Sequence, residues 1–278
     1  MERTLNSGYS IPMVGLGTFR ARGEDVYRAV LHALEAGYRH IDTAVAYKNE
    51  EEVGRALADS SVPREEVFVT TKIWNSAHTK EATTRMIDAS LANLGTDYID
   101  LLLMHWPWTY ERNAAVYAAM EEAADAGKVR TLGISNFHIH HLDALLQTAR
   151  VVPAVNQVEC HVHLQNTRLQ DYLESKGIAM EAYAPFKSDK IQDVLENETL
   201  RSIGDAHGTS PTQVSLRWMV QRGIIALPKS VTPARITENL QVFDFELTDE
   251  EMHAIRKLNR AERTFPEPDN FDPGFLEL

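Results

Sequence analysis

The chain of 278 residues is 44% hydrophobic and 24% charged, a composition typical of soluble globular proteins. Its formal net charge of −12 disfavours nucleic acids and anionic membranes, so we expect neither as a partner. Cys160 is the only cysteine, which excludes an internal disulfide, and the sequence shows no apolar signal region and no run near the ~18 residues of a membrane span, so we expect a cytoplasmic protein.

Short apolar runs typical of strands alternate with stretches whose apolar residues recur every three to four positions. The eight strand-like runs cover residues 14–18, 38–42, 67–72, 99–104, 130–134, 154–158, 178–183 and 224–227. Helical spacing marks residues 24–36, 79–94, 114–126, 138–149 and 211–222. Alternating strands and helices form parallel sheets, and eight of each close into a barrel. The pattern therefore predicts an α/β fold of the (β/α)8 TIM-barrel type.

The two ends of the chain lie outside this repeat. Residues 4–11, around Asn6-Ser7-Gly8, predict an N-terminal β-hairpin at the barrel bottom. Residues 264–278 are rich in proline and phenylalanine, so we expect a non-helical C-terminal tail near the barrel mouth. No linker or low-complexity stretch divides the chain, and residues 1–278 are expected to form a single barrel domain.

Four titratable side chains stand at or just past the ends of three strand-like runs. Asp42 ends one run and Tyr47 follows it. Lys72 ends the next run, and His105 follows a third. A phenol has a reference pKa of about 10, too high for acid–base work at neutral pH, but a neighbouring ammonium lowers that pKa. Because barrel enzymes build their sites where the strands end, these residues predict a proton-transfer site in which Asp42 holds Lys72 and Lys72 lowers the pKa of Tyr47.

Five motifs in order resemble the aldo-keto reductase family. They are Asp42-(x4)-Tyr47, Thr71-Lys72-Ile73-Trp74-Asn75, Leu103-Met104-His105-Trp106-Pro107, Gly133-Ile134-Ser135-Asn136-Phe137 and Leu227-Pro228-Lys229-Ser230-Val231. The similarity is strongest to short-looped microbial members such as the diketogluconate reductases. The resemblance implies NADPH-dependent reduction of aldehydes or ketones to alcohols, without a metal. Hydride would pass from the nicotinamide to the carbonyl carbon, with Tyr47 as the general acid and His105 orienting the carbonyl.

The resemblance also assigns the cofactor contacts. At the nicotinamide end they are Thr18, Ser135, Asn136, Gln157 and Tyr183, with the Tyr183 ring stacked on the nicotinamide. At the adenosine end they are Lys229, Ser230, Arg235, Glu238 and Asn239. Cations at the start of a helix also suit a phosphate on physical grounds. The chain departs from the family pattern at Ala184, where serine is common, and at Phe186-Lys187, where Leu-Gly is common. Ser188 is the candidate to replace the lost hydroxyl contact to the pyrophosphate.

Four aromatic residues are implied as an apolar wall for a small-molecule carbonyl substrate: Phe19, Trp74, Trp106 and Trp108. Each also has the simpler interpretation of core packing. Few residues separate Trp108 from the helix expected at residue 114, where many relatives carry a long loop. We therefore expect an open mouth, broad substrate selection and a monomeric protein.

Other functions stay open at this point. Gly15-Leu16-Gly17 begins like a dinucleotide fingerprint, but it lacks the third glycine. The acidic residue expected about 20 positions later is not placed after a second strand as required, which disfavours a Rossmann site. The histidines of residues 138–141 and 160–163 lack the spacing of a structural zinc motif, which favours surface or capping roles and no metal. A redox-sensing regulatory subunit of the same fold, as in potassium-channel β-subunits, and a metal-dependent barrel hydrolase or isomerase remain as alternatives.

Overall fold

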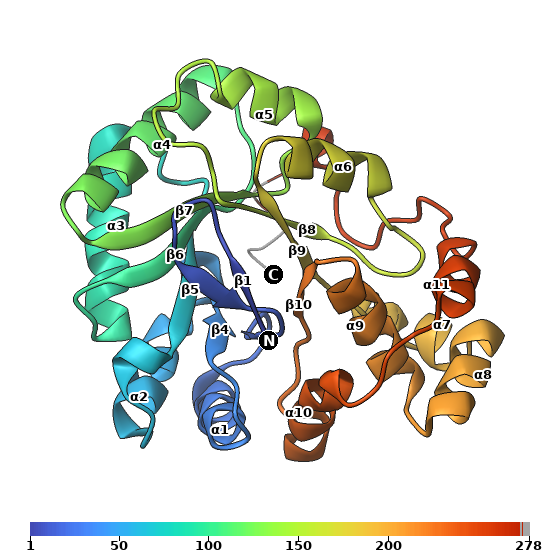
Figure 1. Ribbon diagram of the computed structural model, residues 1–278. Helices are drawn as coiled ribbons and strands as arrows, with labels where there is room; N and C mark the ends of the chain where they lie inside the picture. Colours follow the sequence, from blue (N-terminus) through green and yellow to red (C-terminus); the bar gives the residue numbers. More distant parts are fainter. Residues whose placement is uncertain (273, 275–278) are drawn as a thin grey trace.

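The computed structural model describes residues 1–272 and 274, and its centre is a barrel of parallel strands (Figure 1). The strands are β3 (Leu16–Gly17), β4 (His40–Asp42), β5 (Phe68–Ile73), β6 (Ile99–Met104), β7 (Val129–Ser135), β8 (Val155–Glu159), β9 (Ala179–Tyr183) and β10 (Ile225–Leu227). Each strand pairs with the next along the chain, and parallel bridges from Val14 to Ala226 and from Gly17 to Lys229 join the last strand to the first. The TIM barrel expected from the sequence is confirmed.

Helices surround the strands on the outside of the barrel (Figure 1). They are α1 (Gly23–Glu35), α2 (Glu50–Asp59), α3 (Lys80–Leu94), α4 (Tyr110–Asp125), α5 (Ile139–Leu145), α6 (Thr167–Ser175), α7 (Gln192–Leu195), α8 (Glu198–His207), α9 (Pro211–Gln221), α10 (Pro233–Leu240) and α11 (Asp249–Arg256). Over residues 1–272 and 274, none of the helices has the length and apolar character needed to cross a membrane.

The barrel strands are buried on both faces, because helices cover the outside and side chains fill the inside. Successive side chains of β6 point to opposite faces, yet Leu101, Leu102 and Leu103 are all fully buried. This is why the strands appear as continuous apolar runs in the sequence. Packing is close enough that a Cβ at Gly133 on β7 would lie 2.5 Å from a side-chain carbon of Leu103.

The predicted elements differ from the observed ones at their ends. The helix expected from residue 114 begins at Tyr110, because the Asn113 side chain accepts the backbone N–H of Trp108 at 2.8 Å and fixes the first turn. The helix expected over residues 138–149 ends at Leu145, and the strand expected over 14–18 is reduced to Leu16–Gly17.

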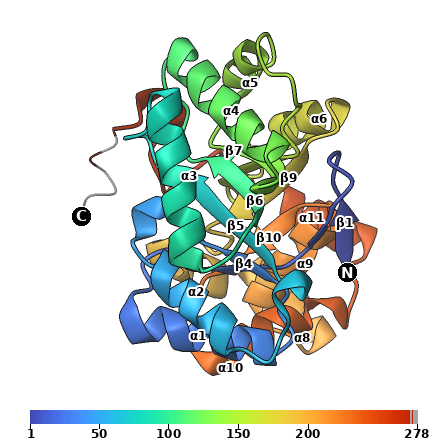
Figure 2. The same cartoon turned by 90° about the vertical axis from the view of Figure 1, so that its left-hand side faces the viewer.

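The strands β1 (Glu2–Thr4) and β2 (Ser10–Pro12) form the expected antiparallel hairpin. Gly8 at its tip has a φ of 86°, a left-handed conformation that glycine adopts without steric cost. Asn6 donates to the carbonyl oxygen of Pro153 at 3.1 Å, and the hydroxyls of Ser7 and Thr131 lie 3.0 Å apart. Pro153 and Thr131 lie near the beginnings of β8 and β7, so the hairpin covers the N-terminal end of the barrel. Figure 2 shows it on the side opposite to the C-terminal segment.

The C-terminal segment contacts the other end of the barrel, where the strands finish. The Glu159 carboxylate at the end of β8 accepts the backbone N–H groups of Thr264 at 2.7 Å and Phe265 at 3.1 Å. Further along, the 3₁₀ turn η5 (Pro268–Asn270) precedes Phe271, whose ring stacks on Trp106 with centroids 4.0 Å apart. Residues 273 and 275–278 of the expected tail lie outside the described residues.

Cys160 lies just beyond β8 and is fully buried. Its Sγ lies 3.9 Å from the carbonyl oxygen of Gln165, a contact typical of a weak S–H donor. Burial raises the pKa of the thiol to about 12. The group therefore stays protonated at neutral pH and packs as a small apolar side chain.

Candidate active site

Strands β4, β5 and β6 bring the predicted acid–base residues together at their C-terminal ends. Lys72 Nζ donates to Asp42 Oδ1 at 2.6 Å and to the carbonyl oxygen of Thr43 at 2.8 Å. Tyr47 ends the short 3₁₀ turn η1 (Val45–Tyr47), and its hydroxyl oxygen lies 3.4 Å from Lys72 Nζ. His105 follows β6, and its ring packs edge-on against the Tyr47 ring with centroids 5.7 Å apart. The four residues are therefore neighbours in space.

Asn49, which the sequence analysis did not single out, holds the loop that carries Tyr47. Its side chain accepts a hydrogen bond from the Thr43 hydroxyl at 2.6 Å. The same amide donates to the carbonyl oxygens of Thr18 at 3.1 Å and Ala21 at 2.9 Å. Asn49 is fully buried, and a buried amide is costly to strip of its partners. It therefore fixes the loop after β4 relative to the loop after β3.

A second carboxyl group, Glu181 on β9, lies behind Asp42. The Gln157 amide donates to Asp42 Oδ2 at 2.8 Å and to Glu181 Oε2 at 2.7 Å, so the two carboxyls share one donor group. Burial, followed by the charge of Asp42, raises the pKa of Glu181 to about 8. Burial lowers the pKa of His40, whose Nε2 is 3.8 Å from Glu181 Oε1, to about 3. At neutral pH both Glu181 and His40 are therefore uncharged.

The environment of Tyr47 differs from the expectation. Burial, followed by the charges of Asp42 and Glu181, raises the pKa of Tyr47 well above 10. The net lowering of this pKa expected from the neighbouring ammonium is therefore not found, because burial and the two carboxyl charges dominate. Tyr47 is therefore protonated at neutral pH. Lys72 lies where it stabilises the phenolate that remains once a proton has left.

His105 is held as a neutral imidazole. Burial, followed by the charge of Lys72, lowers the pKa of His105 well below 6.5. Its backbone carbonyl accepts a hydrogen bond from Asn136 Nδ2 at 3.0 Å, which ties it to the end of β7. A neutral imidazole can donate one hydrogen bond to an oxygen without adding a charge to a buried site.

A cavity of ≈260 Å³ lies against these groups and collects most of the predicted residues. The predicted residues that line it are Asp42, Tyr47, His105, Ser135, Asn136, Gln157, Tyr183, Ser188, Lys229, Phe19 and Trp106. Among the described residues, its lining does not include Lys72, which is fully buried, nor Thr18, Trp74, Trp108, Ser230, Arg235, Glu238 or Asn239. Thr18 is buried instead, and its hydroxyl donates to the carbonyl oxygen of Asp42 at 3.0 Å.

The residues expected at the nicotinamide end form a connected set that keeps free acceptor capacity. Tyr183 donates its hydroxyl to Asn136 Oδ1 at 2.8 Å, and Asn136 Nδ2 donates to Ser135 Oγ at 3.1 Å. Ser135 Oγ donates in turn to the carbonyl oxygen of Gln157 at 2.9 Å. The carbonyl oxygen of Gln157 also accepts the backbone N–H of Asn136 at 2.8 Å. Asn136 Oδ1 and Ser135 Oγ each carry two lone pairs, of which one is occupied. A carboxamide NH₂ group, the donor that a nicotinamide offers, fits this set.

Two cations lie where an anionic group can reach them. Lys229 lines the cavity, and both Lys229 and Arg235, near the start of α10, are exposed. Partial desolvation by the cavity wall, followed by the charge of Arg20, lowers the pKa of Lys229. Arg20 pairs with Asp189 at 2.9 Å across the same cavity rim. In a chain of net charge −12, this local cluster of cations supplies what a phosphate requires.

The other residues expected at the adenosine end are engaged within the protein. Ser230 Oγ accepts the backbone N–H of Thr232 at 3.1 Å just before α10. Glu238 accepts the hydroxyl of Ser210, the N-cap of α9, at 2.5 Å. Asn239 is buried on α10. These contacts fix the first turns of α9 and α10. The exposed side chains of Lys229 and Arg235 therefore project from backbone that is held in place.

The departures from the family pattern lie in the loop after β9. Ala184, Lys187 and Ser188 all have positive φ, at 49°, 62° and 49°, a conformation that costs energy for residues other than glycine. Phe186 and Ser188 line the cavity, and Ser188 opens the 3₁₀ turn η3 (Ser188–Lys190). Ser188 is thus placed on the cavity side, as the sequence analysis supposed for a replacement contact.

Lys187 in this loop is fully buried, an uncommon state for a lysine. Its ammonium donates to Asp193 Oδ2 at 2.5 Å and to Glu262 Oε1 at 3.0 Å. Glu262 belongs to the segment that leads into the C-terminal tail. The lysine that stands where relatives commonly have glycine therefore ties the loop after β9 to that segment.

The aromatic residues expected to form the substrate wall fall into two groups. Phe19 and Trp106 line the main cavity, whereas Trp74 and Trp108 line a separate small cavity of ≈10 Å³. Trp106 lines both cavities. In the C-terminal tail, Phe265 lines the main cavity, and Phe271 stacks on Trp106 and meets the Trp74 ring edge-on with centroids 5.9 Å apart. The tail thus narrows a mouth that the sequence analysis expected to be open.

The second histidine group, residues 160–163, is structural. His161 Nε2 lies 3.1 Å from Glu159 Oε1, and His161 Nδ1 accepts the backbone N–H of His163 at 3.3 Å. Both histidines are buried. These contacts stabilise the turn after β8. The surface or capping role expected for this group is wrong, because both histidines are buried in the interior.

Comparisons with known proteins agree with the geometry of this site. The model of the Aldo/keto reductase family matches residues 13–260. Over 266 residues the chain is 43% identical to the glyoxal reductase of Bacillus subtilis, covering 95% of each chain. Over 268 residues it is 41% identical to the methylglyoxal reductase DkgA of Escherichia coli, covering 96% of each. A solved aldo-keto reductase enzyme from a Medee basin deep-sea metagenome library is 50% identical, with a TM-score of 0.96 over 97% of this chain and 99% of that one. This chain belongs to the aldo/keto reductase family.

Proposed function

We propose that this protein reduces small aldehydes and ketones, α-dicarbonyl compounds foremost, to alcohols with NADPH. The observation that carries the proposal is the Tyr47 hydroxyl, 3.4 Å from the Lys72 ammonium and beside the His105 ring, on the wall of a cavity large enough for a small reactant. These three groups supply a proton, a charge that stabilises its loss, and a neutral hydrogen-bond donor.

Tyr47 acts as the general acid, and its neighbours set its protonation. The bound nicotinamide supplies a hydride to the carbonyl carbon. Tyr47 gives its proton to the carbonyl oxygen as negative charge develops there, so the alcohol forms and a phenolate is left. Lys72 stabilises that phenolate, Asp42 holds Lys72, and His105 orients the oxygen. General acid catalysis contributes roughly 100- to 10,000-fold, and the positioning of the two reactants contributes more.

The residues on the cavity wall support NADPH as the hydride donor. Acceptor oxygens of Ser135, Asn136 and Gln157 suit a nicotinamide carboxamide, and Tyr183 presents a ring beside them. Lys229 and Arg235 suit the 2′-phosphate that distinguishes NADPH from NADH.

Small substrates are favoured by the shape of the mouth and by the relatives. Phe265 of the tail lines the main cavity, whose volume is ≈260 Å³, and Phe271 packs against Trp74 and Trp106 beside it. Two of the similar proteins are named for the reduction of glyoxal and methylglyoxal. A dicarbonyl of this size fits a short apolar wall made by Phe19 and Trp106.

The experiment is a steady-state assay of NADPH oxidation with methylglyoxal, aryl aldehydes and keto-sugars, together with dissociation constants of both cofactors. Turnover of methylglyoxal distinguishes an enzyme from a redox sensor that only binds the cofactor. A hydrogen bond to a charged group contributes roughly 1.5–3 kcal/mol, so Arg235→Ala should weaken NADPH binding by about 10- to 100-fold and NADH binding much less. Equal weakening of both cofactors, at one fixed salt concentration, would make Arg235 a structural residue.

A further inference from the structure

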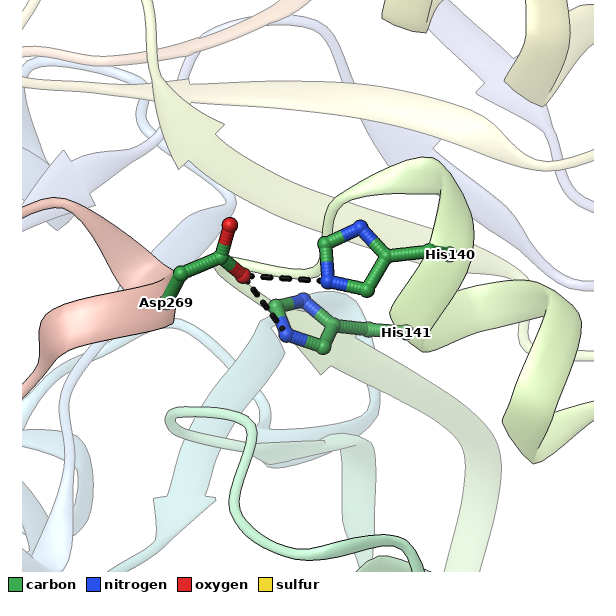
Figure 3. A group of neighbouring side chains, drawn as sticks. All are labelled: His140, His141 and Asp269. Atoms are coloured by element: carbon green, nitrogen blue, oxygen red, sulfur yellow. Dashed lines mark ion pairs between the residues drawn. The ribbon is translucent and has the colours of Figure 1, made fainter.

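The first histidine group, which the sequence assigns to surface or capping roles, converges on the C-terminal tail. His140 and His141 on α5 each place Nε2 3.0 Å from the same oxygen, Oδ1 of Asp269 in η5 (Figure 3). The centroids of the two imidazole rings lie 4.0 Å apart. His138 and Glu267 form a flanking ion pair between the same two elements.

The three facing atoms have the spacing of a metal-ligand set. His140 Nε2, His141 Nε2 and Asp269 Oδ1 all lie within 4.8 Å of one another. Zinc binds histidine nitrogen and carboxylate oxygen at about 2.0–2.2 Å, which in a tetrahedral site puts the ligand atoms roughly 3.3 Å apart. Small side-chain rotations therefore bring the three atoms around one ion, and water completes the coordination.

We infer that His140, His141 and Asp269 bind a divalent transition-metal ion of the zinc type. Two imidazoles select such ions over Mg²⁺ and Ca²⁺, which prefer oxygen ligands. His140 and Asp269 are exposed, and His138 and His140 line an open cavity of ≈620 Å³, so the ion can reach the site from solvent.

Binding requires one local rearrangement. His141 Nδ1 accepts the backbone N–H of His138 at 3.1 Å, so neutral His141 carries its proton on Nε2, the atom that faces Asp269. When the ion takes the Nε2 lone pair, that proton moves to Nδ1 and the bond from the His138 N–H is lost. No proton is released, and the loss is one ordinary hydrogen bond at the start of a helix.

The ion would act as a clamp on the tail. Asp269 precedes Phe271 by two residues, and Phe271 stacks on Trp106 at the cavity wall. Joining Asp269 to α5 through a metal therefore restrains Phe271 against Trp106 and, with it, the tail beside the cavity. This consequence is independent of which carbonyl compound the enzyme takes, since binding of the ion needs neither cofactor nor substrate.

Isothermal titration of the full chain with ZnCl₂ tests the inference, using protein without a polyhistidine tag and stripped by a chelator. We expect one site of micromolar affinity for Zn²⁺ and no binding of Mg²⁺. Losing a hydrogen-bonding partner of a ligand costs roughly 10- to 100-fold in metal affinity, so His140→Ala and Asp269→Asn should cost at least as much. His253→Ala, which removes an exposed histidine on α11, should bind like the wild type.

A structural readout separates the clamp from binding elsewhere. Zn²⁺ should slow amide hydrogen exchange in residues 264–271 of the wild type and of His253→Ala, but not of Asp269→Asn. Asparagine has nearly the shape of aspartate at an exposed position, so folding is not in question. Absence of Zn²⁺ binding, or equal binding by Asp269→Asn, His140→Ala and the wild type, overturns the inference.

Discussion

Burial and the nearby carboxyl charges keep Tyr47 protonated, although it remains partly exposed on the cavity wall. Its pKa lies well above 10, so the phenol does not lose its proton to solvent at neutral pH. Neither neighbouring charged group can accept the Tyr47 proton. The Lys72 ammonium is itself a donor, and the oxygens of the Asp42 carboxylate already accept hydrogen bonds from Lys72 and Gln157. The proton can therefore leave usefully only toward a group that develops negative charge in the cavity.

Replacing Tyr47 by phenylalanine keeps the ring and removes this proton. We expect Tyr47→Phe to lower kcat for carbonyl reduction by at least about 100-fold, the lower range of general acid catalysis. NADPH affinity should stay close to that of the wild type, because the hydroxyl contacts only Lys72 among the described residues. Steady-state kinetics and a fluorescence titration with NADPH measure the two quantities.

The matched control is Tyr9→Phe, which removes a hydroxyl from an exposed tyrosine of the N-terminal hairpin. It should leave both quantities unchanged. Near-normal turnover in Tyr47→Phe would remove Tyr47 from the role of acid and leave His105 as the group to test.

Among the elements, the loop after β9 and the C-terminal tail shape the cavity together. Lys187 joins the loop to Glu262, and Glu159 at the end of β8 binds the backbone of Thr264 and Phe265. These bonds fix the start of the tail, and Phe271 then fills the space beside Trp106. The C-terminal tail, which follows the last barrel strand by many residues, therefore helps to set the width of the cavity mouth.

Removing the Phe271 ring should widen the selection of substrates. An aromatic pair contributes about 0.5–1.5 kcal/mol beyond its buried area, so the ring of an aryl aldehyde that takes the vacated place should lower its KM by roughly 2- to 10-fold in Phe271→Ala. KM for methylglyoxal should not fall, because that molecule has no ring. The assay is steady-state kinetics with both substrates.

The neighbouring exposed residue provides the control for this change. Asn270→Ala should behave like the wild type with both substrates. A parallel change in the two KM values for Phe271→Ala would mean that the tail supports the fold of the site and does not select by size.

The sequence predicted the elements that repeat and missed the contacts that do not. Apolar runs such as Leu101, Leu102 and Leu103 predicted buried strands because both faces of a closed barrel are covered. Asp42 and Lys72 were found because they end such runs. Glu181 stands in the middle of the otherwise apolar run 178–183, not at its end, and only the pairing of β8 with β9 sets it beside Gln157.

Residues whose partners are distant in sequence gave no signal at all. The buried ammonium of Lys187 depends on the carboxylates of Asp193 and Glu262. The stacked ring of Phe271 depends on Trp106, which is far away in the sequence. Neither spacing nor composition reports such contacts. The helix starting at Tyr110 was placed late for a similar reason, since one side chain, Asn113, forms its first turn.

For the molecule as a whole, an uncharged Glu181 inside the barrel makes stability depend on pH. Its pKa is about 8 in the folded protein against an ordinary 4.5, so between these values the folded state holds a proton that the unfolded state has lost. Stability from this group is therefore complete below about pH 4.5 and declines as the pH rises toward 8, by at most about 1.4 kcal/mol per pH unit.

Glu181→Gln should flatten this decline, because an amide does not titrate and its oxygen can still accept from Gln157. Urea unfolding between pH 5.5 and 8.5 gives the free energy of unfolding of each variant at each pH. Glu65→Gln, which changes an exposed glutamate, should retain the slope of the wild type. Parallel slopes in all three proteins would show that Glu181 is ionised in the folded state.

The burial of Cys160 determines whether reactive carbonyl compounds can modify the single thiol of the chain. Only a thiolate attacks an electrophile or an oxidant with useful speed. With a pKa of about 12, the Cys160 thiol is ionised in about one molecule in 100,000 at pH 7. The side chain is also fully buried next to the end of β8. No other sulfhydryl exists in the chain. The protein therefore offers reactive carbonyl compounds no thiolate, and their attack is left to other nucleophiles such as its lysines and arginines.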